Sequence, residues 1–281
     1  MNLFALNDII LYMNIIPKKE PSFSNNNLDI NYFETIVSII MPCFNSSLTI
    51  RESIDSVLKQ SFSKWELIIV DDCSADSSFL IVSEYAKNDT RIKLFKTSKR
   101  SGAAIARNIA IKQAKGRFIA FLDSDDLWEK EKLQKQIDFM IKKDIAFSYS
   151  DYYVLYPNGQ KKIYKVKDKV NYKKLLKNNL IGCLTAIYDT EKIGKIYMPV
   201  DALKREDFAA WLFILHNVKY AYKTKGVLAT YRISSTSVSS RKIRMIKYQW
   251  NVYRKIENIS IFKSSFLLIA YIFNKSFLKY K

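Results

Sequence analysis

Short apolar runs alternate with longer amphipathic segments through the first half of the chain. The runs are bounded by charged or turn-forming residues and predict strands, at residues 37–42, 65–70, 92–95 and 118–122. The amphipathic segments repeat apolar residues at helical spacing and predict helices, at residues 50–58, 77–87 and 103–114. Because crossovers of this length suit parallel pairing, the pattern predicts an α/β fold with a mostly parallel sheet flanked by helices.

The pattern changes after Trp128. Helices are predicted at residues 128–142, 172–178 and 208–216, and strands at 146–155, 162–166, 184–188 and 220–231. The turn signal Pro157–Gly159 predicts that the strands on either side of it form a hairpin. From Ser240 onward the chain is predicted to be helical, and no internal repeat is visible.

Carboxylates follow two of the predicted parallel strands. Asp71 and Asp72 end one of them, and Asp123, Asp125 and Asp126 end another. Parallel strands end at one edge of the sheet, where open α/β sheets bind ligands. Alternate carboxylates on an extended backbone can both approach one hard cation. The pattern therefore predicts a divalent metal that holds a phosphorylated ligand, although the last acid could instead cap the next helix.

Composition favours an anionic partner. The 281 residues carry a formal net charge of +19, which suits nucleic acid, an anionic membrane surface or a phosphorylated substrate. Three scattered cysteines fit a reducing compartment and disfavour zinc. The only histidine, His216, excludes a multi-histidine metal site and is predicted to pack inside an apolar helix.

Five motifs in order resemble those of a known family. They are VSIIMPCFN at 37–45, ELIIVDD at 66–72, SGAAIARN at 101–108, FLDSDDLW at 121–128 and REDFAAW at 205–211. Over residues 36–235 the chain resembles the inverting family 2 glycosyltransferases of bacteria, above all those that build O-antigen, capsule or teichuronic-type polysaccharides. The resemblance implies a GT-A fold, with a Rossmann-like, mostly parallel sheet and a basic helical C-terminal extension.

The resemblance also implies a domain division and a donor site. Residues 1–35 would be an N-terminal appendage and linker, 36–127 the nucleotide-sugar half, 128–235 the acceptor half, and 236–281 a basic helical region. Donor-binding positions of the family fall on Pro42, Phe44, Asn45, Asp72, Arg107 and Asp123. The DxD motif falls on Asp123 and Asp125, which implies Mg²⁺ or Mn²⁺ held mainly by Asp125.

The family's catalytic base falls on Asp207, with Glu206 as the second candidate. An inverting displacement needs one carboxylate to take the proton of the attacking hydroxyl. The implied reaction moves one sugar from a nucleotide-sugar donor, UDP-hexose above others, to a lipid-diphosphate-linked or saccharide acceptor. Two alternatives stay open on the residues alone: a nucleotidyltransferase, and a basic nucleic-acid-binding protein without catalysis.

The C-terminal region has two interpretations. From Arg241 to Lys281 the chain has ten Lys or Arg residues against one acid. We expect this region to lie on the anionic inner face of the bacterial membrane, with Trp250, Tyr253 and Phe266 at the interface, which implies a cytoplasmic, peripheral enzyme. The alternative is a helical pair packed on the catalytic domain. The apolar run at 266–273 is too short to span a bilayer.

Overall fold

The computed structural model describes residues 36–233 and 242–277. The chain divides into two compact units, residues 1–33 and 34–281, and the second contains all the described residues. The predicted N-terminal appendage and linker at residues 1–35 lie outside the described residues.

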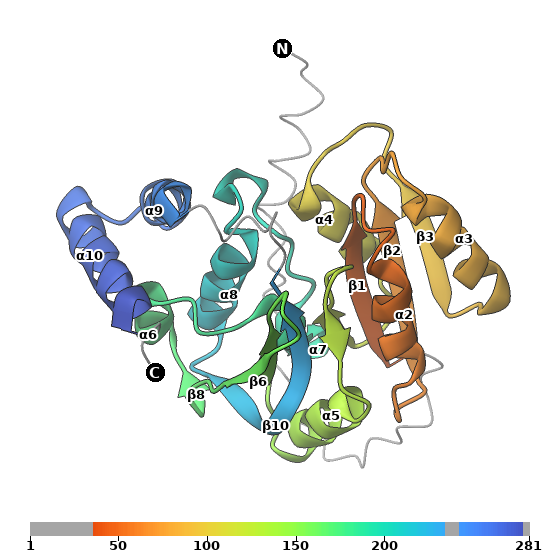
Figure 1. The fold of residues 1–281 in the computed structure, drawn as a ribbon. Helices are drawn as coiled ribbons and strands as arrows, with labels where there is room; N and C mark the ends of the chain where they lie inside the picture. Colours follow the sequence, from red (N-terminus) through yellow and green to blue (C-terminus); the bar gives the residue numbers. More distant parts are fainter. Residues whose placement is uncertain (1–35, 234–241, 278–281) are drawn as a thin grey trace. The chain divides into compact units, whose positions relative to one another are not determined.

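The described residues form a ten-stranded sheet in the order β3-β2-β1-β4-β9-β6-β10-β5, with β7 on β6 and β8 on β10. Four strands make its parallel half, β1 (Val37–Cys43), β2 (Trp65–Asp71), β3 (Ile92–Lys96) and β4 (Phe118–Phe121). They are connected by α2 (Ile50–Leu58), α3 (Ser78–Asn88) and α4 (Ala103–Gln113) (Figure 1). The predicted α/β class with a central, mostly parallel sheet is thus confirmed.

Strand β1 runs one residue past the predicted stop at Pro42. Alternate residues of a parallel strand face opposite neighbours, and the carbonyl of Cys43 accepts a hydrogen bond from Asp72 N at the β2 edge. Pro42 therefore faces the β4 edge, where pairing ends at Ile40 with Phe121. Because no ladder partner is present at that point, the missing N–H of proline breaks no hydrogen bond.

The second half of the sheet is mixed. The predicted hairpin is confirmed, since β6 (Phe147–Leu155) pairs antiparallel with β7 (Lys161–Tyr164). The predicted strand at 184–188 is wrong in its first half, where Cys183–Thr185 forms the 3-10 helix η2 before β9 (Ile187–Asp189). The remaining strands are β5 (Leu127–Trp128), β8 (Lys169–Val170) and β10 (Ala221–Arg232).

The later helices follow in this half of the chain, some against the sheet and others against helices. They are α5 (Lys132–Lys142), α6 (Tyr172–Lys177), α7 (Thr190–Ile193), η3 (Val200–Ala202), α8 (Glu206–Asn217), α9 (Lys242–Asn251), the π-helical turn η5 (Val252–Ile256) and α10 (Ile261–Phe277). None of the helices within the described ranges is both long enough and apolar enough to cross a bilayer.

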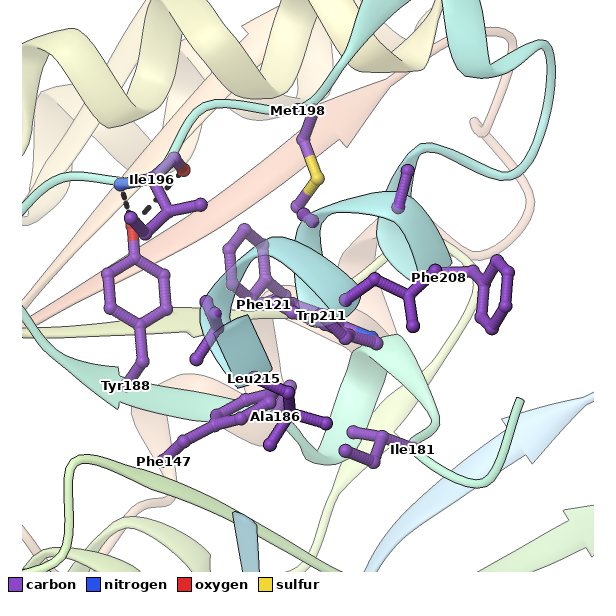
Figure 2. Packing of buried hydrophobic residues seen from close by; sticks show 14 of the residues in the cluster. Phe121, Phe147, Ile181, Ala186, Tyr188, Ile196, Met198, Phe208, Trp211 and Leu215 are labelled. Carbon is purple, nitrogen blue, oxygen red and sulfur yellow. Dashed lines mark hydrogen bonds between the residues drawn. The ribbon is translucent and has the colours of Figure 1, made fainter. Parts of the chain in front are cut away.

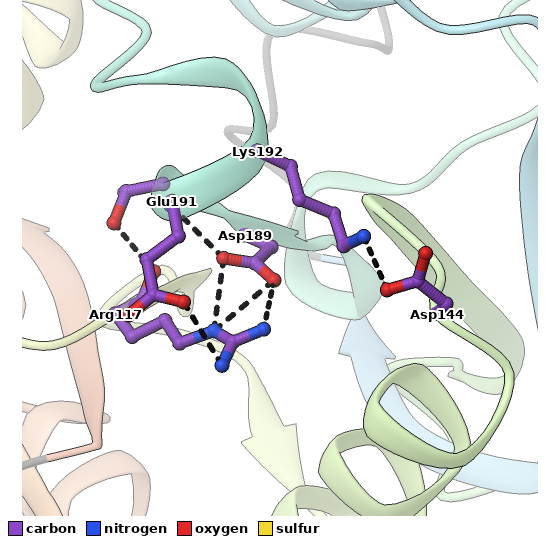
Figure 3. A network of polar contacts seen from close by, with 6 residues as sticks. Arg117, Asp144, Asp189, Glu191 and Lys192 are labelled. Atoms are coloured by element: carbon purple, nitrogen blue, oxygen red, sulfur yellow. Dashed lines mark hydrogen bonds and ion pairs between the residues drawn. The ribbon is translucent and has the colours of Figure 1, made fainter. Parts of the chain in front are cut away.

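An ion-pair network joins the start of β4 to the end of β9 (Figure 3). The guanidinium of Arg117 donates two hydrogen bonds of 3.1 and 2.7 Å to Asp189 Oδ2 and also pairs with Glu191 at 3.0 Å. Lys192 pairs with Asp144 nearby. Asp189 is almost fully buried, so this bidentate pair fixes the antiparallel register of β4 against β9.

Helix α8 packs Trp211 directly against the sheet (Figure 2). Trp211 meets Phe121 of β4 edge-on, with ring centroids 5.3 Å apart, and meets Phe147 of β6 at 5.2 Å. All three side chains are fully buried or nearly so. Phe121 lies two residues before Asp123. This packing therefore fixes α8 relative to residues 123–126, which we call the acidic loop.

Helix α10 packs on α6 (Figure 1), and η5 contacts η3 and the Phe208 ring of α8. Tyr253 is fully buried, stacks edge-on against Phe208 and donates to the carbonyl of Leu176. Its predicted place at a membrane interface is therefore wrong, because the ring fills the core. His216 is also placed differently from prediction: it is half exposed and bonds Glu257 at 3.0 Å.

Candidate functional site

Three loops at the carboxyl ends of β1, β2 and β4 are joined by side-chain hydrogen bonds. The hydroxyls of Ser46 and Ser124 lie 2.7 Å apart, which links the β1 loop to the acidic loop. Asn45 adopts a positive φ of 47°, accepts from Ala75 N at 2.8 Å and donates its own N–H to Ser74 at 2.9 Å. The predicted convergence of these strand ends is therefore present.

Asp72 holds the loop that leads into α4. Its carboxylate accepts the backbone N–H groups of Ser101 and Gly102, both at 2.7 Å, and the hydroxyl of Thr97 at 3.0 Å. Gly102 has a φ of 93°, a conformation that glycine adopts without strain. The carboxylate predicted to contact the nucleotide thus also shapes the N-terminus of the helix that carries Arg107.

The aromatic residue of the β1 loop lies partly at the surface. Phe44 is half-buried, and the guanidinium of Arg100 lies 4.1 Å from its ring centroid. Pro42 by contrast is buried inside β1. Phe44 and Asn45 therefore offer surface to a ligand, whereas Pro42 shapes the strand end beneath them.

Arg107 joins the two acidic motifs. Its Nη2 lies 2.6 Å from Asp123 Oδ1, and its Nη1 lies 3.2 Å from Glu206 Oε1. The arginine is only 6% exposed, and the two carboxylates hold its pKa well above the usual value despite burial. The side chain predicted beside the diphosphate therefore also ties the acidic loop to the start of α8; its contact with the diphosphate stays a prediction.

The acidic loop concentrates negative charge. Burial and the neighbouring Asp123 raise the pKa of Asp125 to about 6. Asp126 is 2% exposed, accepts the backbone N–H of Arg232 at 2.9 Å, and has a pKa raised well above normal by burial and by both acids. The alternative that it caps a helix is wrong, since α5 begins only at Lys132.

This negative charge suits a divalent cation that is shared between the protein and a bound phosphate group. No group of three or more His, Cys, Asp or Glu side chains among the described residues is arranged to hold a metal by itself. Mg²⁺ and related ions, however, are commonly held by one or two carboxylates, with phosphate oxygens and water completing the shell. Asp123 is about a third exposed and Asp125 is half-buried, so both carboxylates can contribute to such a shell.

The two acids at the start of α8 differ in their surroundings. Glu206 is ion-paired with Arg107, whereas Asp207 is half-buried with the Nδ2 of Asn179 3.4 Å from its Oδ2. Burial and the charge of Glu206 raise the pKa of Asp207. The structure thus separates a carboxylate engaged in an ion pair from one with a raised proton affinity.

Two residues near this cluster were missed in the sequence, and a third, Arg232, has partners that the sequence did not reveal. Asn179 contacts Asp207, and Cys183 lies close enough to Arg107 and three carboxylates for their charges to act on its thiol, whose pKa burial raises far above normal. Arg232 pairs with Glu52 at 2.6 Å while its backbone bonds the acidic loop. None belongs to a recognisable motif, so only the fold could bring them together.

The sequence profile of Glycosyl transferase family 2 matches residues 38–190. The chain is 43% identical over 218 residues to the Escherichia coli UDP-Glc:alpha-D-GlcNAc-diphosphoundecaprenol beta-1,3-glucosyltransferase WfgD, covering 77% of this chain and 85% of the relative. It is 41% identical over 241 residues to TuaG of Bacillus subtilis, covering 85% of this chain and 95% of the relative. TuaG is named as a glycosyltransferase of teichuronic acid biosynthesis.

Solved structures share the fold. S. aureus TarS in complex with UDP-GlcNAc matches with a TM-score of 0.67 at 22% identity, covering 85% of this chain and 72% of that one. The mannosyltransferase PcManGT from Pyrobaculum calidifontis, in complex with GDP-Man and Mn²⁺, matches with a TM-score of 0.61 at 17% identity, covering 92% and 72%.

Proposed function

Because the chain belongs to glycosyl transferase family 2, we propose that it transfers one sugar, with inversion, from a UDP-hexose to a polyprenyl-diphosphate-linked saccharide during bacterial surface polysaccharide synthesis. The name of the relative WfgD supports this donor and acceptor class, and the name of TuaG supports a role in surface polysaccharide synthesis. Residues 36–127 form the donor half and 128–235 the acceptor half of this proposed enzyme.

The observation that carries the proposal is the ion-pair bridge from Asp123 through Arg107 to Glu206. It connects the acidic loop of the donor half to the helix start that presents Asp207. In a single displacement the leaving diphosphate and the attacking hydroxyl lie on opposite sides of the anomeric carbon. The reaction therefore needs the acidic loop and the start of α8 to be held in a fixed arrangement. The buried Arg107 holds both, since it pairs with a carboxylate of each.

On the donor side, Phe44 offers a ring face to the base, while Asn45 and Asp72 flank the same loops. Mg²⁺ or Mn²⁺, bound by Asp125 with help from Asp123, would supply positive charge against the charge that grows on the diphosphate as the sugar departs. The raised pKa of Asp125 supports this role, because it comes from burial and from the charge of Asp123, and a bound cation would offset both.

On the acceptor side, Asp207 takes the proton of the acceptor hydroxyl. The hydroxyl oxygen forms the new bond to the anomeric carbon as the bond to the diphosphate oxygen breaks. The raised pKa of Asp207 suits a base, and the ion pair of Glu206 with Arg107 favours Asp207 over Glu206 for this task.

The test is transfer from UDP-Glc to a synthetic polyprenyl-diphosphate GlcNAc, with the product's linkage read by NMR. We expect a β-linked product, loss of transfer with EDTA and recovery with Mn²⁺ or Mg²⁺. Asp207→Asn should reduce kcat on the order of 10²- to 10⁴-fold, while Asp201→Asn, an exposed acid upstream, should not. An α-linked product, or no turnover with any UDP-, dTDP- or GDP-sugar, would refute the proposal.

The pH profile gives a second readout of the base. Asp207 must be ionised to accept a proton, and its pKa is raised, so the rate should climb with pH through that raised value. The rising limb should disappear in Asp207→Asn. A rising limb that persists unchanged in this variant would assign the titration to another group.

The acceptor's lipid tail implies a location. We propose that the protein is cytoplasmic and peripheral, held at the anionic inner face of the bacterial cell membrane through its basic C-terminal region, residues 236–281. The excess of ten basic residues over one acid supports this location.

A further inference from the structure

Helix α10 has two apolar faces, and only one of them is covered. Its inner face, Ser264, Leu267 and Tyr271, is at most 5% exposed. Large apolar residues repeat along its outer face at spacings of four, three and four: Phe262 is 90% exposed, Phe266 65%, Ile269 55% and Phe273 60%. We call these four residues the outer stripe.

The outer stripe is not the usual scatter of exposed apolar side chains. Elsewhere in the described residues, exposed large apolar residues lie singly, such as Leu80 on α3 and Ile163 on β7, or as the one pair Val200 and Leu203 at η3. A contiguous row of large apolar residues on a surface helix is costly in water, and such patches mark interaction sites.

The basic residues of the C-terminal region indicate which partner the stripe binds. Lys247 of α9, Lys255 of η5 and Lys263 of α10 are all exposed, within a region of ten basic residues and one acid. A second copy of this chain would bring the same positive charge against itself. An anionic lipid surface supplies both an apolar layer for the phenylalanines and negative headgroups for the lysines.

The inner face connects this helix to the proposed base. The hydroxyl of Tyr271 accepts a hydrogen bond from Arg205, whose guanidinium also lies 5.2 Å from the tyrosine ring. Arg205 immediately precedes Glu206 and Asp207 at the start of α8. The helix that carries the outer stripe is therefore in direct contact with the segment that presents the base.

We propose that α10 lies in the plane of an anionic membrane, with the outer stripe inserted among the acyl chains and the inner face fixing Arg205. This inference rests on the proposed function for the lipid-linked acceptor, and it identifies the surface by which the site meets that acceptor. Docked in this way, α10 brings the start of α8 to the lipid surface, from which the acceptor's sugar projects.

The test uses the full chain and vesicles of phosphatidylcholine with or without phosphatidylglycerol. Wild type should sediment with the anionic vesicles, less so at high salt, and only weakly with phosphatidylcholine alone. The triple variant Phe262→Ser, Phe266→Ser, Phe273→Ser should partition at least about tenfold more weakly. The matched control Leu80→Ser with Ile163→Ser removes exposed apolar side chains elsewhere and should bind as wild type does.

Unaltered vesicle binding by the triple variant would overturn the proposal, as would equal binding of wild type to neutral vesicles. A wild-type dimer that the triple variant dissociates, without vesicle binding, would assign the stripe to a second copy. Transfer to a water-soluble, short-tailed acceptor should survive in the triple variant, while transfer to acceptor embedded in vesicles should fall. If wild type transfers to neither acceptor, the proposed function fails, whereas the vesicle result still decides the membrane surface.

Discussion

At the scale of single residues, Arg107 is the most informative side chain. The sequence motif identified the residue, and the resemblance assigned it to the diphosphate. The fold shows what the motif could not: two carboxylates from segments 83 residues apart, Asp123 and Glu206, meet on one guanidinium. A planar fork with several donors can satisfy both at once, and a lysine ammonium cannot reproduce that geometry.

We predict that Arg107→Lys folds but lowers kcat on the order of 10²-fold, because the acidic loop and α8 lose their shared anchor. The measurement is kcat and KM for sugar transfer, together with the melting temperature. Arg117→Lys is the matched control, since Arg117 also joins two carboxylates, Asp189 and Glu191, at the opposite end of β4. It should lower stability and leave kcat near wild type. Equal kcat losses in both variants would mean that Arg107 acts only through folding.

At the scale of elements, the parallel half of the sheet was predictable because each strand is a continuous apolar run ending in a turn or an acid. Helices α3 and α4 and strands β2 and β3 agree with prediction to within one residue at each end. Strand β9 was misplaced because its three residues carry no periodicity of their own. Its position between β4 and β6 comes from long-range pairing and the buried Arg117–Asp189 contact.

The helix that begins with Glu206 was predicted from its apolar residues, and its partners were not. Trp211 is fully buried between Phe121 and Phe147, and its indole N–H finds no acceptor among the described residues. We predict that Trp211→Ala costs about 3–5 kcal/mol in urea unfolding. Trp211→Phe should cost much less, because it keeps an aromatic ring and removes the unpaired donor.

Trp250 of α9 provides the control for that measurement. It is only half-buried, so Trp250→Ala should lower the free energy of unfolding by less than Trp211→Ala does. A cost at Trp250 equal to or larger than that at Trp211 would show that α8 is not the central packing element of this half.

At the scale of the whole molecule, the two interpretations of the C-terminal region turn out to be compatible. The region packs on the catalytic domain through Tyr253 and Leu267, and the same segment exposes the outer stripe. The sequence could not separate these faces, since apolar residues for the core and for a lipid surface look alike until the partners of each are known. The residues proposed for the donor, the metal and the base stood out as motifs, whereas the bridge between them did not.

We predict that deleting residues 242–281 lowers the melting temperature by about 10 °C or more, because burial of Val252, Tyr253 and Leu267 is lost. Circular dichroism or calorimetry measures this change. Phe266→Ser, which alters an exposed residue of the same region, should leave the melting temperature within about 1 °C. An unchanged melting temperature after the deletion would contradict the packing of α9 and α10 on the domain.

The single histidine has a practical consequence. His216 is the only imidazole in the chain; its ring centroid lies 4.2 Å from that of Tyr172, tilted against it, and it bonds Glu257 just after η5. Its ring protons therefore give one isolated pair of NMR signals without isotopic labelling, at the seam between α8 and the C-terminal segment. Any event that shifts this segment against the catalytic domain, vesicle binding included, can be followed through that one natural probe.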